Sequence, residues 1–214
     1  MDPAGVRGKL AGFCLALACM LLPCSAVALD FTVLGRGSGN IIFASGGFER
    51  GDAARLEALL RQTTNTQVLA FRSPGGLSME GLAVGRVIRR AGIATHLPAN
   101  TQCASACTYA FLGGRVRTME EGARYGVHIF STSGNRGLLR RAEALIQSEG
   151  TAAVAGLIRM IEEDSAQMAA QLAYYAIEMG VSLRLLEPNF RTAHNTIRWL
   201  TARELRDFNV VNAD

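Results

Sequence analysis

Short apolar runs alternate with amphipathic helical segments through the first 130 residues of this chain. The strand-like runs are residues 40–46, 67–71, 93–97 and 125–130. The helical segments between them are residues 52–62, residues 77–91 and a third that begins at Ser105. Strands joined by helices lie parallel in one sheet that the helices cover. The alternation therefore predicts an α/β fold with a largely parallel sheet.

The pattern changes to helix after residue 135. Residues 136–147 and 151–179 carry apolar side chains three and four positions apart, with Gly150 between the two segments. The second segment has more apolar positions than one helix packed on a sheet needs, so we expect a homo-oligomer. The acidic cluster at residues 162–164 predicts a solvated helix face, because no histidine or cysteine stands near it to complete a metal site. No internal repeat or linker divides the chain, so residues 29–214 are expected to form a single domain.

Residues 1–28 have the features of a secretory signal peptide. A short basic start precedes an apolar run at residues 10–22, and small residues follow at Ala26 and Ala28. We expect cleavage after Ala28 and a periplasmic or secreted protein. A retained membrane anchor is the less favoured alternative, because about 13 apolar residues are fewer than the ~20 that span a bilayer as a helix.

Charge and residue usage narrow the functions that the domain can have. The net charge is +4, and the basic residues are scattered without interleaved aromatic residues, so we expect no nucleic-acid binding. Lys9 is the only lysine and lies in the signal segment, which excludes a serine–lysine dyad from the domain. A nucleophilic serine would therefore need His96, His128 or His194 as its base.

The segment NTQCASACTYAFLGG, residues 100–114, places Ser105 between two alanines at the expected start of a helix. The pair Gly75–Gly76 follows an expected strand in the motif SPGG. Backbone N–H groups of Gly76 and Ala106 could form an oxyanion hole, in which Ser105 would be the nucleophile. The alternatives are that Ser105 only caps the helix and that the two glycines form a plain turn.

The motifs FRSPGG, GIATHLPANTQCASACTYAFLGGRVR and YGVHIF together resemble the core of the ClpP-type serine peptidases of the ClpP/crotonase superfamily. RWLTARELRDFNVVN, residues 198–212, is similar to the segment that closes the ClpP domain. The resemblance is closest to signal-peptide-bearing periplasmic ClpP-like bacterial proteins. It implies a repeated β-β-α core with a helical C-terminal part. It also implies that Ser105 is the nucleophile, His128 the general base, and Gly76 and Ala106 the oxyanion hole.

The sequence departs from the ClpP pattern at the third catalytic residue. Where the pattern has an aspartate just before RWLTA, this chain has Ile197. Asn195 or Thr196 could orient the imidazole instead, although replacing a triad aspartate by an amide costs about ten-thousandfold in rate. ClpP also relies on a cytoplasmic ATPase, a partner that an exported protein lacks.

The sequence therefore leaves two functions from different classes. The first is an exported, ATP-independent serine hydrolase of peptidase-like type, acting on a peptide or acyl substrate without cofactor or metal. The second is a catalytically degenerate ClpP-fold protein that binds partners or serves as a scaffold in the cell envelope. The acyl-CoA chemistry of crotonases is least favoured, because its substrate is cytoplasmic. The alternative for His128 is a core histidine, His96 is expected to be structural, and His194 is either a surface residue or a third catalytic member.

Cys103 and Cys107 are the two cysteines outside the signal segment. Residues four apart on a helix have Cα atoms about 6 Å apart, which a disulfide tolerates. A bond in the oxidising export compartment would hold the turn that carries Ser105. The alternatives are two buried thiols that only pack, or a metal site, for which two sulfurs without a nearby histidine are insufficient.

Overall fold

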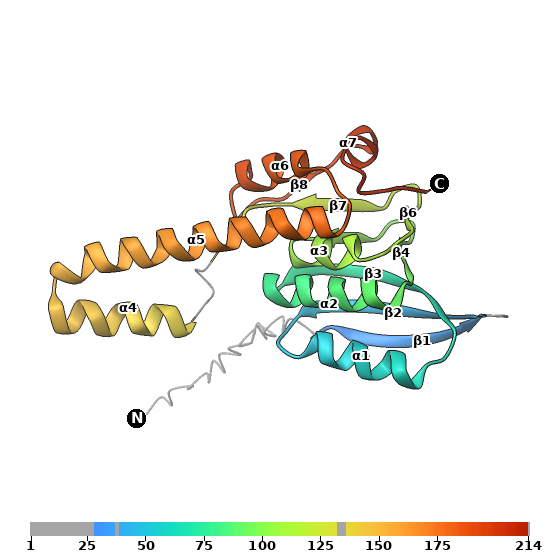
Figure 1. Ribbon diagram of the computed structural model, residues 1–214, viewed down its shortest axis with the longest axis horizontal. Helices are drawn as coiled ribbons and strands as arrows, with labels where there is room; N and C mark the ends of the chain where they lie inside the picture. Colours follow the sequence, from blue (N-terminus) through green and yellow to red (C-terminus); the bar gives the residue numbers. More distant parts are fainter. Residues whose placement is uncertain (1–27, 37–38, 132–135, 214) are drawn as a thin grey trace, which may run out of the picture.

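The computed structural model describes residues 28–36, 39–131 and 136–213 and shows an eight-stranded sheet with helices packed against it (Figure 1). The strands are β1 (Asp30–Arg36), β2 (Gly39–Phe48), β3 (Thr66–Gly76), β4 (Ala94–Leu97), β5 (Gln102–Ala104), β6 (Arg117–Met119), β7 (Arg124–Val127) and β8 (Arg198–Trp199). The helices are α1 (Asp52–Gln62), α2 (Ser78–Ala91), α3 (Ala106–Leu112), α4 (Arg136–Glu149), α5 (Ala152–Glu178), the 3-10 turn η1 (Leu183–Leu185), α6 (Leu186–Arg191) and α7 (Ala202–Asp207). The predicted α/β class is confirmed.

The sheet follows the order β1-β2-β3-β5-β7-β8, and its four central strands β2, β3, β5 and β7 are parallel. The long strand β3 serves two branches: its first half pairs with β4, which in turn pairs with β6, and its end pairs with β5 at Ser73 and Cys103. The units β1–β2–α1, β4–β5–α3 and β6–β7–α4 repeat two strands and a helix. This is the β-β-α repetition that the resemblance implies.

The core lies between the sheet and the helices α2 and α3 (Figure 1). Alternating residues of β3 point inward, among them Leu69 and Phe71, and every residue of α3 is buried. Burying a leucine or phenylalanine side chain contributes about 1.5–3 kcal/mol, so this layer supplies much of the stability of the fold. Burial of α3 on all sides also fixes the residue before it, Ser105.

Arg117 on β6 is a fully buried arginine. Its guanidinium donates hydrogen bonds to the backbone carbonyls of Gly114, Asn209 and Val210, at 2.7–2.9 Å. Burial lowers the pKa of Arg117 to about 10, which still leaves it charged at neutral pH. The side chain therefore attaches the C-terminal end of the chain to the sheet.

The helices α4 and α5 form a hairpin whose outer half extends away from the sheet (Figure 1). Large apolar side chains are exposed along these two helices, namely Leu139, Ile146, Val154, Ile158, Ile161, Tyr174 and Ile177. The acidic cluster at residues 162–164 is exposed, as predicted. Within the described ranges, no helix has the length and hydropathy of a membrane span.

Several element boundaries differ from the prediction, among them the end of β3, which continues through SPGG to Gly76. Gly51 caps α1 in a left-handed conformation, and the buried carboxylate of Asp52, the first residue of the helix, accepts from the Glu49 N–H at 2.7 Å. The strand predicted at residues 125–130 is β7, which ends at Val127 because the chain leaves the sheet at His128. The predicted signal peptide lies outside the described residues, apart from Ala28, which forms a bridge with Gly47, and it stays a prediction.

Candidate active site

The predicted site residues lie at one edge of the sheet. Because β3, β5 and β7 are parallel neighbours, their carboxyl ends share that edge. Gly75 and Gly76 end β3, Ser105 follows β5, and His128 follows β7. The carboxyl ends of parallel strands are where α/β proteins place their ligand sites. The structure therefore gathers the glycine pair, the serine and the histidine in one region.

Ser105 adopts an unusual backbone conformation, with φ 55° and ψ −125°. Its N–H donates to the Gly126 carbonyl at 3.0 Å, and its own carbonyl accepts from the N–H and the hydroxyl of Thr108 at 2.9 and 2.5 Å. A non-glycine residue in such a conformation costs about 1–3 kcal/mol, and strain of this kind gathers at functional sites. The Ser105 side chain makes no capping hydrogen bond to α3, so the helix-cap interpretation is not supported.

The glycine pair is required by close packing. A side chain at Gly75 would place its Cβ 2.5 Å from the Cβ of Ser105, and one at Gly76 would meet the Phe48 carbonyl oxygen at 2.3 Å. Both glycines have positive φ, 109° and 142°. The buried Ser73 hydroxyl accepts from the Gly75 N–H at 3.1 Å and holds the turn. The backbone of the glycine pair therefore packs directly against Ser105, the candidate nucleophile.

Two backbone N–H groups flank Ser105. Ala106 is the first residue of α3, so its N–H is among those without an acceptor inside the helix. Gly76 precedes Leu77, whose N–H donates to Phe48 on β2 at 2.9 Å. The Gly76 N–H belongs to the residue after Gly75, at which a Cβ would lie 2.5 Å from the Ser105 Cβ.

His128 is half-buried just beyond β7, and its Nδ1 lies 2.7 Å from the Ile129 carbonyl oxygen. A carbonyl oxygen only accepts hydrogen bonds, so Nδ1 carries the proton and the neutral ring has an unprotonated Nε2. This is the tautomer that a general base for serine requires. The Ile129 N–H donates to the Thr192 carbonyl at 2.9 Å. This bond anchors the backbone of Ile129, whose own carbonyl contacts His128.

The structure does not join His128 to the two residues that were predicted to orient its imidazole. Asn195 and Thr196 are exposed, the Thr196 hydroxyl donates to the Ala193 carbonyl at 3.1 Å, and no contact joins either residue to His128 within the described part of the chain. The pairs Gly126–Trp199 and Val127–Arg198 join β7 and β8. Continuing that antiparallel register would set Ile197 opposite His128.

The two remaining histidines have no contact with Ser105 or His128 among the described residues. His194 is exposed in a turn. His96 lies on β4, in the other branch of the sheet, where Nδ1 is 2.8 Å from the Thr118 hydroxyl and Nε2 is 3.3 Å from a Glu120 oxygen. These contacts fit the structural role predicted for His96.

Cys103 and Cys107 form a disulfide with Cα atoms 5.3 Å apart, which confirms the predicted bond. Both residues are fully buried, Cys103 on β5 and Cys107 in the first turn of α3. The bridge therefore closes around Ser105 and the Ala106 N–H. No group of three metal-ligating side chains occurs in the ranges that the structure describes.

A layer of buried tyrosines supports α3 from its other side. The Tyr125 hydroxyl donates to the Thr108 carbonyl at 3.3 Å, and the Tyr175 hydroxyl donates to the Tyr109 carbonyl at 2.6 Å. Burial raises the pKa of both hydroxyls, so they remain protonated donors at neutral pH. These bonds help to hold the first residues of α3, and with them Ser105, in position.

Sequence reasoning did not identify three contributors to this region. The Ser73 hydroxyl could have been found, because a serine two residues before a glycine commonly closes such a turn. Thr108 is three positions after Ser105, and its hydroxyl gives no distinct signal in the sequence. The Ile129 carbonyl is a backbone group and leaves no trace in the sequence.

No protein-family model matches the chain, and no curated protein matches it. Among solved structures it is similar to ClpP1 from Listeria monocytogenes, with a TM-score of 0.53 and 18% identity over 80% of this chain and 88% of that chain. A mutant of the same protein aligns over the same shares with 19% identity and a TM-score of 0.48. The first of these similarities shows that the chain has a ClpP-like fold.

Proposed function

We propose that this chain is an exported, ATP-independent serine hydrolase of peptidase-like type. Ser105 is the nucleophile, His128 is the general base, and the N–H groups of Gly76 and Ala106 form the oxyanion hole. The observation that carries the proposal is the strained backbone of Ser105, whose hydroxyl makes no cap at the edge that it shares with the glycine pair and His128. A serine that only capped a helix would need neither the strain nor the close-packed glycines.

The reaction follows from this arrangement. The Ser105 Oγ attacks the carbonyl carbon of the substrate while Nε2 of His128 takes the hydroxyl proton. The carbonyl oxygen becomes an anion that accepts hydrogen bonds from the two N–H groups, and one such donor is worth about a hundredfold to a thousandfold in rate. His128 then returns the proton to the leaving group, and water releases the acyl group by the reverse sequence. No metal or cofactor enters these steps.

The Ile129 carbonyl takes over part of the role of the missing aspartate in this proposal. It fixes the imidazole tautomer by accepting the Nδ1 proton. As a neutral group it stabilises the imidazolium less than a carboxylate does, so we expect a slow hydrolase.

The second candidate is a catalytically degenerate binding or scaffold protein. The apolar Ile197 favours it, because continuing the register of β7 and β8 would set this residue opposite His128, where the ClpP pattern has an aspartate near the imidazole. In either case we expect a homo-oligomer, since the exposed apolar side chains of α4 and α5 favour burial against another copy.

Labelling with a fluorophosphonate tests the proposal, because this reagent reacts with an activated serine whatever the natural substrate. The mature protein should incorporate one label, and Ser105→Ala should incorporate none. Thr108→Ser is a matched control, since it keeps the hydroxyl that donates to the Ser105 carbonyl. Absence of labelling in a folded wild-type protein would favour the degenerate candidate.

A further inference from the structure

A pocket of about 360 Å³ opens beside the candidate active site. Its lining residues come from β2, β3 and β5, and they are Ser45, Gly46, Arg72, Ser73, Pro74 and Gln102. Pro74 directly precedes the glycine that contacts Ser105. No acidic side chain lines the pocket, and Arg72 is its only charged member. The pocket is therefore positively charged and adjoins the reacting edge.

Arg72 projects from the exposed side of β3, and its guanidinium lies 5.6 Å from the ring centroid of Phe43. Arg124 on β7 stacks on Trp199 at 4.5 Å, and its Nη2 donates to the Gln102 side chain at 3.2 Å. Because Gln102 pairs with Arg124 across β5 and β7, the second arginine stands next to the pocket wall. Both guanidinium groups are held in place by aromatic rings.

Among the described residues, no carboxylate neutralises these two arginines. Within the described ranges, neither Arg72 nor Arg124 has a carboxylate oxygen within 4.0 Å. Other arginines have a carboxylate oxygen within this distance, namely Arg55, Arg61, Arg86, Arg90, Arg191, Arg198 and Arg203. An aromatic ring orients a guanidinium without neutralising its charge. The guanidinium of Arg72 therefore remains available to an anion, as do the N–H groups of Arg124 that do not donate to Gln102.

We infer that this pocket binds a carboxylate of the substrate and selects acidic peptides, an inference that rests on the proposed hydrolase function. Gln102 is three residues before Ser105, which corresponds to about 10 Å along an extended strand. A glutamate or aspartate side chain two or three residues from the scissile bond spans that distance. The planar guanidinium of Arg72 offers paired donors that match the two oxygens of a carboxylate.

Two fluorophosphonates with peptide tails of equal length test the inference. One tail carries glutamate two residues from the phosphorus, and the other carries glutamine at the same place. The wild-type protein should react about fivefold faster with the glutamate probe, which is the range of an exposed charge pair. Arg72→Gln should reduce this ratio, and the double variant Arg72→Gln with Arg124→Gln should bring it close to one.

The matched control is Arg61→Gln, which removes the same charge from an exposed position on α1. This variant should keep the wild-type ratio. A wild-type ratio near one, or a ratio that Arg72→Gln leaves unchanged, would overturn the inference. Loss of the ratio in Arg61→Gln would do so as well, because the preference would then reflect net charge alone.

A binding measurement separates failure of this inference from failure of the hydrolase proposal. Fluorescein-labelled tetrapeptides with glutamate or glutamine are titrated into the Ser105→Ala protein, and anisotropy reports their Kd values. If neither fluorophosphonate reacts but the glutamate peptide binds about fivefold more tightly in an Arg72-dependent way, the carboxylate pocket stands and the hydrolase proposal fails. Equal Kd values for the two peptides would reject the pocket even if Ser105 is reactive.

Discussion

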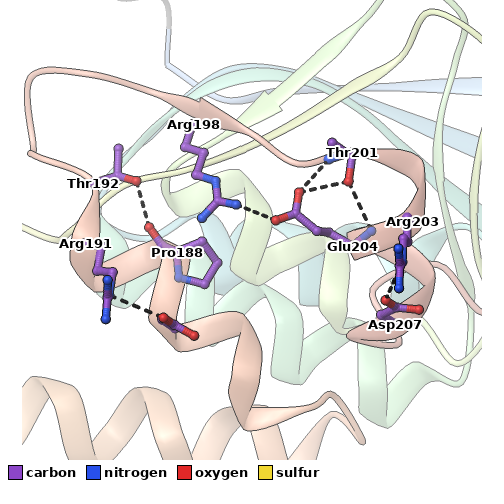
Figure 2. A network of polar contacts seen from close by, with 9 residues as sticks. Pro188, Arg191, Thr192, Arg198, Thr201, Arg203, Glu204 and Asp207 are labelled. Carbon is purple, nitrogen blue, oxygen red and sulfur yellow. Dashed lines mark hydrogen bonds and ion pairs between the residues drawn. The ribbon is translucent and has the colours of Figure 1, made fainter.

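Polar groups have different roles at the edge that carries Ser105 and in the C-terminal segment, residues 198–211. In the C-terminal segment they pair with one another: Arg198 with Glu204, Arg203 with Asp207, and the Thr201 side chain with the Glu204 N–H in a capping box (Figure 2). At the Ser105 edge the serine hydroxyl makes no cap, and the Ala106 N–H has no acceptor inside its helix. Groups that are paired hold the fold together, whereas unpaired groups remain available to a ligand.

The two regions also differ in how they are held. The Ser105 edge depends on buried elements: the disulfide, the close-packed glycines and the tyrosine bonds to α3. The surface contacts of the C-terminal segment are exposed ion pairs, and its buried anchor is Arg117. Variants of each region should therefore separate loss of reactivity from loss of stability.

The largest effect is expected for His128→Ala. Without the base at Nε2, fluorophosphonate labelling of Ser105 should slow by at least about a thousandfold, with little change in the free energy of unfolding. Labelling rates and urea unfolding measure the two quantities. His194→Ala is the control, because this exposed histidine should leave both unchanged. Labelling of His128→Ala at the wild-type rate would show that another group activates the serine.

Arg117→Met should give the next largest effect, and on stability. Removing the guanidinium leaves the carbonyls of Gly114, Asn209 and Val210 without their donor, so the free energy of unfolding should fall by about 3 kcal/mol. Urea denaturation measures the change. Wild-type stability in this variant would mean that water replaces the guanidinium at no cost.

Gly75→Ala should slow labelling by about a hundredfold, because its Cβ must displace Ser105 from a distance of 2.5 Å. Gly150→Ala is a matched control: this glycine also has positive φ, 60°, but open space around it. The control should lose some stability and keep its labelling rate. Equal labelling rates in the two variants would argue against contact between β3 and the nucleophile as the cause.

Glu204→Gln should have the smallest effect, less than about 1 kcal/mol in the free energy of unfolding, as is usual for exposed ion pairs. The Thr201 backbone N–H, and then its hydroxyl and Arg198, lower the pKa of Glu204. Because the folded pKa is the lower one, the carboxylate stabilises the fold above its unfolded pKa of about 4.3, and this contribution disappears as pH falls through the folded pKa. Unfolding of wild type and variant at pH 7 and pH 3 measures the difference, which should be smaller at pH 3.

Much of the fold could be read from the sequence, because it depends on local patterns. The alternation of apolar runs with helical segments predicted the parallel sheet, and residues 151–179 predicted the long helix α5 within one residue at each end. The strand β1 was not predicted, although it has seven residues. The strands β5, β6 and β8 were also missed, because two or three residues are too few to show an alternating pattern. Pairing with neighbours that are distant in sequence defines those strands.

For the candidate site, the sequence alone determined the residue types and their order along the chain: SPGG, Ser105, His128 and the two cysteines. It could not determine the Ser105 backbone angles, the tautomer of His128 or the Ile129 carbonyl that fixes it. It also gave no sign that Arg72 lines a pocket together with Gln102, to which Arg124 donates a hydrogen bond. These features depend on which strands lie side by side, and the hydrogen bonds and packing between distant segments decide that only when the chain has folded.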